Sequence, residues 1–534
     1  METRREFLRT GAALAAGLAF PACARKRPPL RGRIVGQSDA RGHLLRAGGP
    51  VAGVARREEL PLAILGGGIA GLSAAWRLAR AGVEEFALLE LEDECGGTSI
   101  GGANEVSAFP WGAHYLPVPE RGQRAVCELL AELGLARGFA PDGRLCVPET
   151  ALVRDPKERI FFSGAWSEGL FCVDGADARD LGQLQRFEER VRGLAARRGP
   201  DGKRWFALPL AHSSQDPEAL ALDELSMAQW LEREGLDSPR LRWYVEYACR
   251  DDFGCSLSGT SAWAGLHYFA ARLSESGREP AEFLAWPEGN AFLARALARA
   301  AQGRVRTGQV VLAIEPRGER VLVRVLDAST QALCEYSCAR VICALPRFVA
   351  RRLLSGLPEL GFAMSPWVVA NLTLRERPGS RGFPLAWDNV LRESESLGYV
   401  VATHQQDRTD ARSVWTWYRP FVAADARAAR ESVLAASWED WRDAVLGDLE
   451  RAHEGLADCV ETLDVWRWGH AMVRPEPGFV WSAARRAAAR PAGRVHFAHT
   501  DLSAMALFEE AQWHGVRAAE EVLAARGASF ESWL

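Results

Sequence analysis

Pro61-Leu62-Ala63-Ile64-Leu65-Gly66-Gly67-Gly68-Ile69-Ala70-Gly71 is the stretch that decides the fold of this chain. Its apolar part, 62–65, predicts a short buried parallel strand. Residues 72–80 predict a helix, because apolar residues recur there at helical spacing. Residues 86–89 predict a second strand that ends at Glu90. Strand, G-x-G-x-x-G, helix, strand and acid together predict a βαβ unit that binds a dinucleotide.

Each glycine of this motif has a physical role. Gly66 permits the tight turn, Gly68 lets the backbone approach a pyrophosphate, and Gly71 lets the helix pack closely on the strand. The helix N-terminus offers unpaired N–H groups and a positive dipole end to the phosphates. Glu90 follows Gly71 at roughly the 20-residue spacing expected of an acceptor for the ribose hydroxyl. These flanking features argue against a merely glycine-rich loop.

The composition excludes several classes of protein. The chain of 534 residues has a net charge of −4 with 25% charged residues, so it lacks the basic surplus of a nucleic-acid binder. No apolar run reaches the roughly 18 residues that an internal membrane helix needs. The 11 cysteines include no C-x-x-C pair. We therefore expect no metal site, and buried free thiols are favoured over disulfides.

The first 30 residues have the pattern of an export signal. Residues 4–8, Arg-Arg-Glu-Phe-Leu, precede a weakly apolar stretch and small residues, and they resemble the twin-arginine signal of bacteria. We therefore expect an exported or periplasmic protein that loads a cofactor before it meets the translocase. Cys23 could carry a lipid anchor, the only membrane contact expected, although Phe20 stands where such motifs usually have leucine.

Two later stretches carry a resemblance to a known family. Residues 92–98, Glu-Asp-Glu-Cys-Gly-Gly-Thr, and 111–115, Trp-Gly-Ala-His-Tyr, resemble the flavin-containing amine oxidase superfamily, which includes monoamine and polyamine oxidases, phytoene desaturases and protoporphyrinogen oxidases. The resemblance implies FAD as the cofactor, with the first stretch along its pyrophosphate and the second beside the flavin. The family usually has arginine where this chain has Thr98, so one charge for the phosphates is missing.

The resemblance continues in the expected order. Residues 286–297 resemble the family's helix entry, and 311–346 resemble strands that re-enter the FAD domain, with the Val311 backbone against adenine. Residues 495–523 resemble the closing segment, in which Asp501 would meet the pyrophosphate or ribityl chain. The helix N-terminus near Ala511 would face the flavin pyrimidine, where its dipole stabilises the reduced anion.

The resemblance thus implies a set of cofactor residues. No cysteine follows Cys459, so we expect FAD to be bound non-covalently. The residues expected to bind it are Gly66, Gly68, Ile69, Ala70, Gly71, Glu90, Gly96, Gly97, Thr98, Gly112, Ala113, His114, Val311, Asp501, Glu510 and Ala511.

The fold class that follows is α/β, with a Rossmann-like FAD-binding domain assembled from discontinuous segments and a mixed α+β substrate domain. The expected bounds are a signal peptide at 1–30, an extended arm at 31–59, the FAD-binding domain at 60–118, 280–348 and 484–530, and the substrate domain at 119–279 and 349–483.

The resemblance also implies the chemistry, in which hydride passes from the carbon beside an amine nitrogen to flavin N5. In the family, two aromatic side chains flank the substrate. Phe508 matches one of them, and the other falls near Ala471, so Trp468 or His470 would supply that wall. His470 is the candidate catalytic residue, as a proton acceptor or orienting group, with a structural core histidine as an equal alternative. His114 is a further candidate for binding substrate.

Four acidic residues lie in the expected substrate domain, namely Glu246, Asp251, Asp252 and Asp388. They could dock a cationic amine, such as a polyamine. For any one of them, however, the pattern favours a solvated surface position.

Lysine is nearly absent from the chain, which has 65 basic residues but only Lys26, Lys157 and Lys203 as lysines. Many amine oxidases of the family hold a lysine bonded through water to flavin N5, and the matching position falls at or next to Ala370. Its absence favours an electron acceptor other than oxygen. It also leaves a second function open, an FAD-dependent desaturase or isomerase of an apolar substrate. A flavin-fold protein without catalysis is a third alternative.

Overall fold

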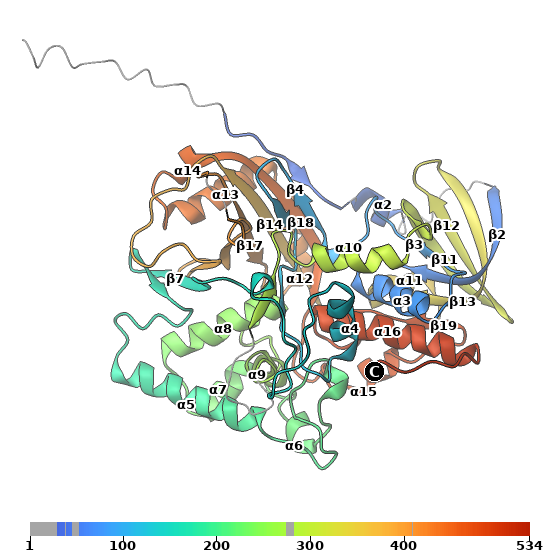
Figure 1. Ribbon diagram of the computed structural model, residues 1–534, viewed down its shortest axis with the longest axis horizontal. Helices are drawn as coiled ribbons and strands as arrows, with labels where there is room; N and C mark the ends of the chain where they lie inside the picture. Colours follow the sequence, from blue (N-terminus) through green and yellow to red (C-terminus); the bar gives the residue numbers. More distant parts are fainter. Residues whose placement is uncertain (1–28, 38, 45–52, 274–281, 408–409) are drawn as a thin grey trace, which may run out of the picture.

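The computed structural model describes residues 29–37, 39–44, 53–273, 282–407 and 410–534. The expected signal peptide, apart from its last residues, and Cys23 lie outside these residues. Two large β-sheets occupy the two ends of the long axis, and a group of helices lies beside one of them (Figure 1). The chain has a mixed α/β fold.

The first sheet has the order β10-β3-β2-β13-β12-β11, and β19 also pairs with β13. β10, β3, β2, β13 and β19 run parallel, whereas β11, β12 and β13 form an antiparallel meander. The strand bounds are β2 (Val54–Leu65), β3 (Ala87–Leu89), β10 (Val305–Arg306), β11 (Gln309–Arg317), β12 (Arg320–Asp327), β13 (Ala332–Cys343) and β19 (Val495–Phe497).

The motif that opened the sequence folds as expected locally. β2 ends at Leu65, and helix α3 (Ile69–Arg80) begins directly after the glycine turn, followed by β3. The predicted strand, helix and second strand are therefore confirmed. β2 begins at Val54, inside the stretch expected to be an extended arm, because residues 54–59 pair with β13.

Helix α3 is held between two other helices. It packs on α16 (Phe508–Ala525) and α10 (Ala291–Ala300) in one apolar core. A Cβ on Gly515 of α16 would lie 2.2 Å from the carbonyl oxygen of Ala70. The two helices therefore cross with their backbones in close contact, which places the start of α16 near the glycine turn.

The second sheet has the order β1-β18-β14-β17-β16-β15-β7-β8. Every residue of β14 is buried, because helices cover one face of the sheet and a cavity-lining aromatic cluster lies on the other. The strand bounds are β1 (Ile34–Val35), β7 (Glu158–Phe162), β8 (Ala165–Glu168), β14 (Met364–Leu374), β15 (Asp388–Leu391), β16 (Gly398–Val401), β17 (Ser413–Pro420) and β18 (Val460–Val473).

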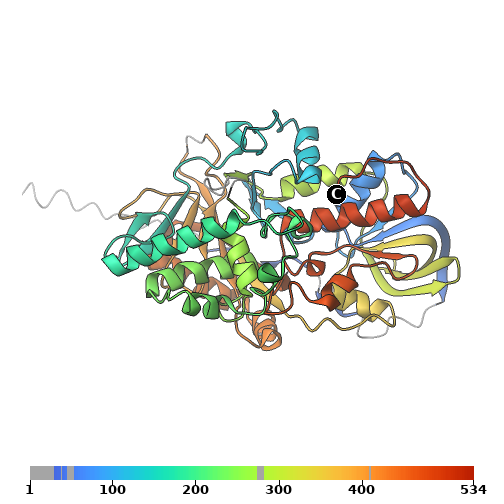
Figure 2. The same cartoon turned by 90° about the horizontal axis from the view of Figure 1, so that it is seen from below.

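A helical group formed by α5, α7, α8 and α9 lies beside this sheet, and α16 runs along the other half of the molecule (Figure 2). These helices are α5 (Ala178–Ala195), α7 (Met227–Arg233), α8 (Pro239–Phe253) and α9 (Ala262–Ala270), and the short helix α6 (Pro217–Leu220) lies between α5 and α7 in the sequence. The other elements are α2 (Asp39–His43), β4 (Gly101–Ala103), β5 (Ala108–Pro110), β6 (Tyr115–Pro117), α4 (Arg124–Glu132), β9 (Phe283–Ala285), α11 (Arg347–Leu353), α12 (Ala426–Ala435), α13 (Trp438–Glu450), α14 (Leu456–Cys459) and α15 (Ala483–Ala488), with single 3-10 turns η1 (Gly97–Ser99), η2 (Glu149–Ala151), η3 (Leu210–His212) and η4 (Thr500–Leu502).

Two general features follow from the described part of the chain. The ten cysteines that it contains are all free thiols, and most of them are buried. None of its helices combines the length and the apolar character that a membrane crossing requires.

Candidate active site

The glycine turn between β2 and α3 is a tight backbone cradle. Gly66 has φ +97°, and a Cβ on it would lie 2.9 Å from the carbonyl oxygen of Ala344. A Cβ on Gly71 would lie 1.9 Å from the carbonyl oxygen of Gly66. Side chains cannot be accommodated at either position, so the helix N-terminus stays open to a ligand that approaches the backbone.

Glu90, at the end of β3, lies directly at this turn. Its Oε2 accepts a hydrogen bond of 2.5 Å from the Gly67 N–H, and its Oε1 accepts one of 2.9 Å from the Glu92 N–H. Burial raises the pKa of its carboxyl group. The acidic residue expected to bind ribose is therefore at the carboxyl end of the parallel strands, next to the phosphate cradle.

The second glycine pair and the 112–114 segment join the same cradle. The Gly96 N–H donates to the Gly67 carbonyl at 2.9 Å. The Ala113 N–H donates to the Thr98 carbonyl at 3.0 Å, and a Cβ on Gly112 would lie only 2.2 Å from that carbonyl oxygen. The structure thus brings together three segments that the sequence assigned separately to one cofactor.

Asp501 has an unused hydrogen-bond acceptor. It is fully buried in η4, where its Oδ2 accepts a bond of 2.5 Å from the Arg347 N–H. Its Oδ1 is buried and has no hydrogen-bond partner among the described residues, because the His499 Nδ1 at 3.2 Å itself accepts from the Asp501 N–H. Because buried polar atoms are nearly always paired, this oxygen fits a hydroxyl group such as those of a ribityl chain.

Val311 and Glu510 differ in how well they match their expected roles. Val311 is buried in β11, two residues after Gln309, whose N–H donates to the Glu90 carbonyl at 2.7 Å. Glu510, in contrast, accepts bonds from the Leu210 N–H at 2.5 Å and the Ser503 hydroxyl at 2.6 Å. Its side chain is therefore occupied by the protein and does not line the cavity, which Glu509 lines instead. Glu510 was expected among the cofactor-binding residues, but its carboxylate accepts hydrogen bonds from the protein instead.

A cavity joins the cradle to the second sheet. It encloses about 1160 Å³ of space outside protein atoms, its open side included. Thr98, Gly112 and Ala113 line one part of it. Its aromatic lining residues are Tyr115, Tyr247, Trp367, Tyr399, Tyr418, Trp468 and Phe508, and its titratable ones include His114, Asp251, Asp252, His267, Arg272, Asp388 and Glu509.

Three expected substrate residues lie in this cavity. Phe508 lines it as the first residue of α16. Trp468 is fixed by a bond of 2.6 Å from its Nε1 to the Trp111 carbonyl. The His114 ring stacks on Tyr418 with centroids 4.7 Å apart, and burial lowers its pKa to about 4. His114 is therefore a neutral, orienting side chain near pH 7.

His470, the expected catalytic residue, lies elsewhere. Its exposed ring packs 4.5 Å from Phe348, and its Nδ1 lies 3.2 Å from the Arg430 guanidinium. The physical reason is a bulge in β18. Trp468 pairs with Trp367 and Met472 with Ser365, so β18 has two more residues than β14 in this interval. His470 is turned outward by the bulge, and its position does not support a catalytic role.

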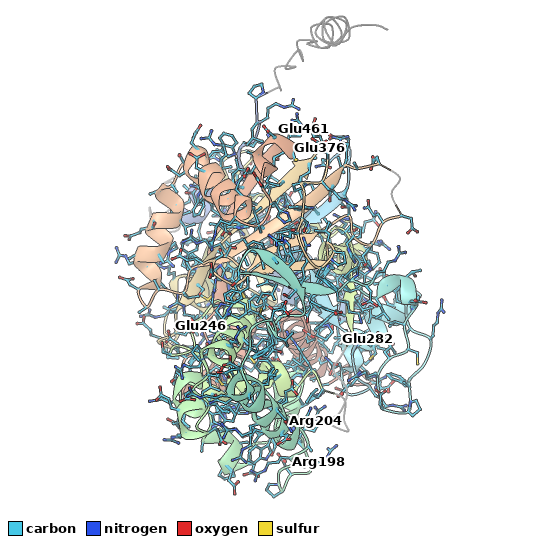
Figure 3. All side chains as sticks on the ribbon, turned by 90° about the vertical axis from the view of Figure 1, so that its left-hand side faces the viewer. Arg198, Arg204, Glu246, Glu282, Glu376 and Glu461 are labelled. Atoms are coloured by element: carbon cyan, nitrogen blue, oxygen red, sulfur yellow. The ribbon has the colours of Figure 1, made fainter. Side chains whose placement is uncertain are left out.

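Three carboxylates that were expected at the surface line the cavity. Asp251 and Asp252 come from the end of α8, and Asp388 begins β15. The surface expectation is wrong for these residues. Glu246, also on α8 and labelled in Figure 3, is not among the lining residues. For Asp251 and Asp252 the sequence held one signal. They lie in the last turn of a helix, where the helix dipole disfavours acidic residues, so their presence there suggests a role beyond the helix.

The three carboxylates differ in their partners. Asp252 forms an ion pair of 2.6 Å with Arg272. Burial and the neighbouring Asp252 raise the pKa of Asp251 to about 7. Asp388 accepts a bond of 3.3 Å from the Tyr247 hydroxyl, and burial with the Asp251 charge raises its pKa well above the usual range.

Strand β14, which should carry the family lysine, contains no lysine. Trp367 and Val369 of β14 line the cavity, whereas Ala370 packs into the core on the opposite face of the sheet. The cavity-facing position next to Ala370 is thus apolar. Whatever this chain uses in place of the lysine must come from another element.

Comparisons with known proteins agree with this arrangement. Residues 69–523 match the family model described as flavin containing amine oxidoreductase. No curated protein matches the sequence of the chain.

Several solved structures share the fold at low sequence identity. A putrescine oxidase with redesigned cofactor binding superposes with a TM-score of 0.65 at 18% identity, over 88% of this chain and 100% of that one. Cyclohexylamine oxidase from Brevibacterium oxydans IH-35A gives 0.62 at 17% identity, over 87% and 99%. A protein from Exiguobacterium sp. 255-15, assigned as a protoporphyrinogen oxidase, gives 0.60 at 16% identity, over 89% and 100%.

Proposed function

Because the chain belongs to the family of flavin-containing amine oxidoreductases and is an FAD-dependent oxidoreductase, we propose that it oxidises an amine at the carbon next to nitrogen. The observation that carries the proposal is the cavity that extends from Thr98, Gly112 and Ala113, beside the glycine turn, to an aromatic wall with three carboxylates. Aromatic faces and carboxylates attract cationic amines. Buried carboxylates would be costly beside a wholly apolar substrate, which disfavours the desaturase alternative.

The residues of the cradle fit FAD. The backbone of Gly66–Gly71 would hold the pyrophosphate at the start of α3, Glu90 would accept from the ribose, and Asp501 Oδ1 would accept from the ribityl chain. FAD, when bound, supplies the chemistry as a hydride acceptor. We propose that it is bound non-covalently, since no cysteine follows Cys459.

The protein's own side chains would orient the substrate and exclude water. Phe508 and Trp468 offer aromatic walls, and the Trp468 ring is fixed by its bond to the Trp111 carbonyl. The Tyr418 hydroxyl donates to the Gly112 carbonyl at 3.3 Å, which ties the second sheet to the cradle. Neutral His114, stacked on Tyr418, would present a ring nitrogen without adding charge.

The test is anaerobic reduction of the purified yellow holoenzyme. We expect aliphatic or aromatic amines, offered one at a time, to bleach the flavin absorbance, because they can enter the cavity and donate hydride. A porphyrinogen and an apolar polyene serve as the matched alternatives. Bleaching by these compounds and by no amine would replace the proposal with a desaturase or isomerase function. A protein without FAD affinity would point to a non-catalytic role.

We also expect the reduced enzyme to react slowly with oxygen. The reason is that the cavity-facing position next to Ala370 is Val369, so β14 provides no lysine. Stopped-flow reoxidation should be at least about tenfold faster with a soluble quinone than with air-saturated buffer, a difference of roughly 1.4 kcal/mol in barrier. Peroxide release at the rate of turnover would contradict this expectation.

Export by the twin-arginine pathway is a further part of the proposal, and it rests on residues 4–8 alone. Replacing both Arg4 and Arg5 with lysine should keep the full-length protein in the cytoplasm, whereas the unaltered chain should be recovered outside it. Cell fractionation and immunoblotting measure the distribution. A Cys23→Ser variant in the same experiment separates lipid anchoring from export, because only anchoring should require the thiol.

A further inference from the structure

The cavity carries more negative than positive charge. The Asp252 carboxylate is matched by Arg272 at 2.6 Å. Among the described residues, no arginine or lysine nitrogen lies within 4.0 Å of the carboxylates of Asp251 or Asp388. Both face phenolic hydroxyls instead, Tyr115 at 3.4 Å for Asp251 and Tyr247 at 3.3 Å for Asp388. These two half-buried carboxylates therefore have no ion-pair partner of their own among the described residues.

Carboxylates without an ion-pair partner raise the free energy of the folded protein unless a ligand supplies the positive charge. Buried charges in proteins are normally paired, because their desolvation is not otherwise repaid. Asp251 and Asp388 are also near enough for the Asp251 charge to raise the pKa of Asp388. A bound cation would lower the free energy of both carboxylates at once.

A second observation points to a missing ligand in the same cavity. Glu509 is only 4% exposed, lines the cavity, and has an Oε1 without a hydrogen-bond partner among the described residues. Polar atoms left unpaired at the wall of a cavity indicate groups that a ligand satisfies.

The surroundings of the two carboxylates suit an organic cation. Tyr247 and Tyr418 lie near both, as the effect of the Asp251 and Asp388 charges on their hydroxyl pKa values shows. Tyrosine faces attract ammonium groups, most strongly where water is excluded. Carboxylates and aromatic rings together therefore favour an ammonium or guanidinium over a metal ion.

The cation held here cannot be the nitrogen that is oxidised. Loss of hydride from the adjacent carbon needs the lone pair of a neutral amine, because that lone pair becomes the new C=N bond. A nitrogen held as an ammonium ion between carboxylates has no free lone pair. The recognised cation and the reacting amine must then be different groups of one substrate.

We propose that Asp251 and Asp388 form a subsite for a second positive group of the substrate, so that the preferred substrates are amines with another cationic centre, such as diamines. This inference rests on the proposed amine oxidation. The subsite lies between the end of α8 and the start of β15, and the reacting amine lies in the rest of the cavity.

The test is equilibrium binding to the oxidised holoenzyme, with two probes that cannot be oxidised to an imine. Choline has one permanent positive charge, and 3,3-dimethyl-1-butanol is its uncharged isostere. Calorimetry should show at least about tenfold tighter binding of choline, from one charge-assisted contact at the subsite. Equal affinities would overturn the proposal. Because no turnover is involved, this result is independent of whether amines reduce the flavin.

Variants then locate the subsite. Asp388→Asn should reduce the preference for choline over its uncharged isostere to less than about twofold, since it removes the charge and keeps the shape. Glu246→Gln removes a carboxylate from the same helix as Asp251, outside the cavity lining, and should leave the preference unchanged. A preference that survives in the Asp388→Asn and Asp251→Asn variants contradicts the assignment of these residues.

The pH dependence of the unaltered protein gives a test that needs no variant. Asp251 has a pKa raised to about 7, and that of Asp388 is raised as well, so the subsite gains charge as pH rises. The probes do not titrate, so the preference for choline over its uncharged isostere should grow between about pH 6 and pH 8. A flat profile would argue against the subsite. The groups that face the two carboxylates are Asp252, Arg272, Glu158 and the tyrosines Tyr115, Tyr247, Tyr268, Tyr399 and Tyr418, and the cavity also holds His114, His267 and Glu509.

Discussion

A Gly71→Val substitution is expected to produce a protein that no longer retains FAD. A Cβ at this position would lie 1.9 Å from the carbonyl oxygen of Gly66, and backbone atoms cannot move aside as a flexible side chain can. Helix α3 must shift from β2, which opens the cradle and costs more than about 3 kcal/mol, or roughly a hundredfold in FAD affinity.

The measurement is the ratio of flavin to protein absorbance after purification, followed by titration of FAD into the apoprotein. Gly193→Ala is the matched control, because a Cβ on Gly193 in helix α5 would meet no other atom within 4 Å. It should keep its FAD and gain up to about 1 kcal/mol in stability. A Gly71→Val protein with normal FAD content would mean that the cradle is not the cofactor site.

An Arg272→Met substitution should be the most destabilising single change at the cavity. Arg272 is the cation that compensates Asp252, and its guanidinium also lies 4.1 Å from the centre of the Tyr268 ring. Its removal leaves buried carboxylates without any positive charge. The expected loss is about 3–5 kcal/mol in the free energy of unfolding.

This loss should depend on pH with a definite sign. Arg272 now holds down the pKa of Asp251, so its removal raises that pKa further above about 7. A carboxyl with a raised folded-state pKa binds more protons folded than unfolded, so stability falls as pH rises from its ordinary range through the folded value. Denaturant unfolding should therefore show a larger loss near about pH 8 than near about pH 6.

A surface arginine provides the comparison. Arg192 pairs with Glu188 at 3.7 Å on the exposed side of α5. Arg192→Met should cost no more than about 0.5 kcal/mol at either pH, because exposed ion pairs are screened by water. If the two variants lose equal stability, the charge at the cavity is not compensated by Arg272 as the structure indicates.

The cradle was predictable from the sequence because its physics is local. Residues 61–90 contain the strand, the glycines, the helix and the acid, and each residue type is needed for its own backbone position. Asp501, expected at the cofactor from the order of the later segments, lies buried in η4. Trp468 and Phe508 were found by resemblance and lie in the cavity.

The predictions that failed concern residues whose position depends on how elements distant in the sequence meet. Asp251 and Asp388 line one cavity only because the end of α8 lies near the start of β15, where the Tyr247 hydroxyl donates to Asp388, and neither local pattern specifies this contact. Glu509 and Glu510 are neighbours on α16, and the Leu210 N–H and Ser503 hydroxyl select which one is occupied by the protein. A bulge in β18 reversed the direction of His470, and bulges are set by strand pairing.

The short strand β1 has a consequence for the outer edge of the second sheet. It pairs in parallel with β18 through Ile34 and Val35, and a Cβ on Gly32 would lie 1.8 Å from the Leu463 carbonyl oxygen. An edge strand with unpaired N–H and C=O groups is a template for association with other chains. Residues 31–36 therefore make the outer edge of the sheet a short strand in place of the long β18, and we expect a chain without them to expose more of β18 to pairing with other chains.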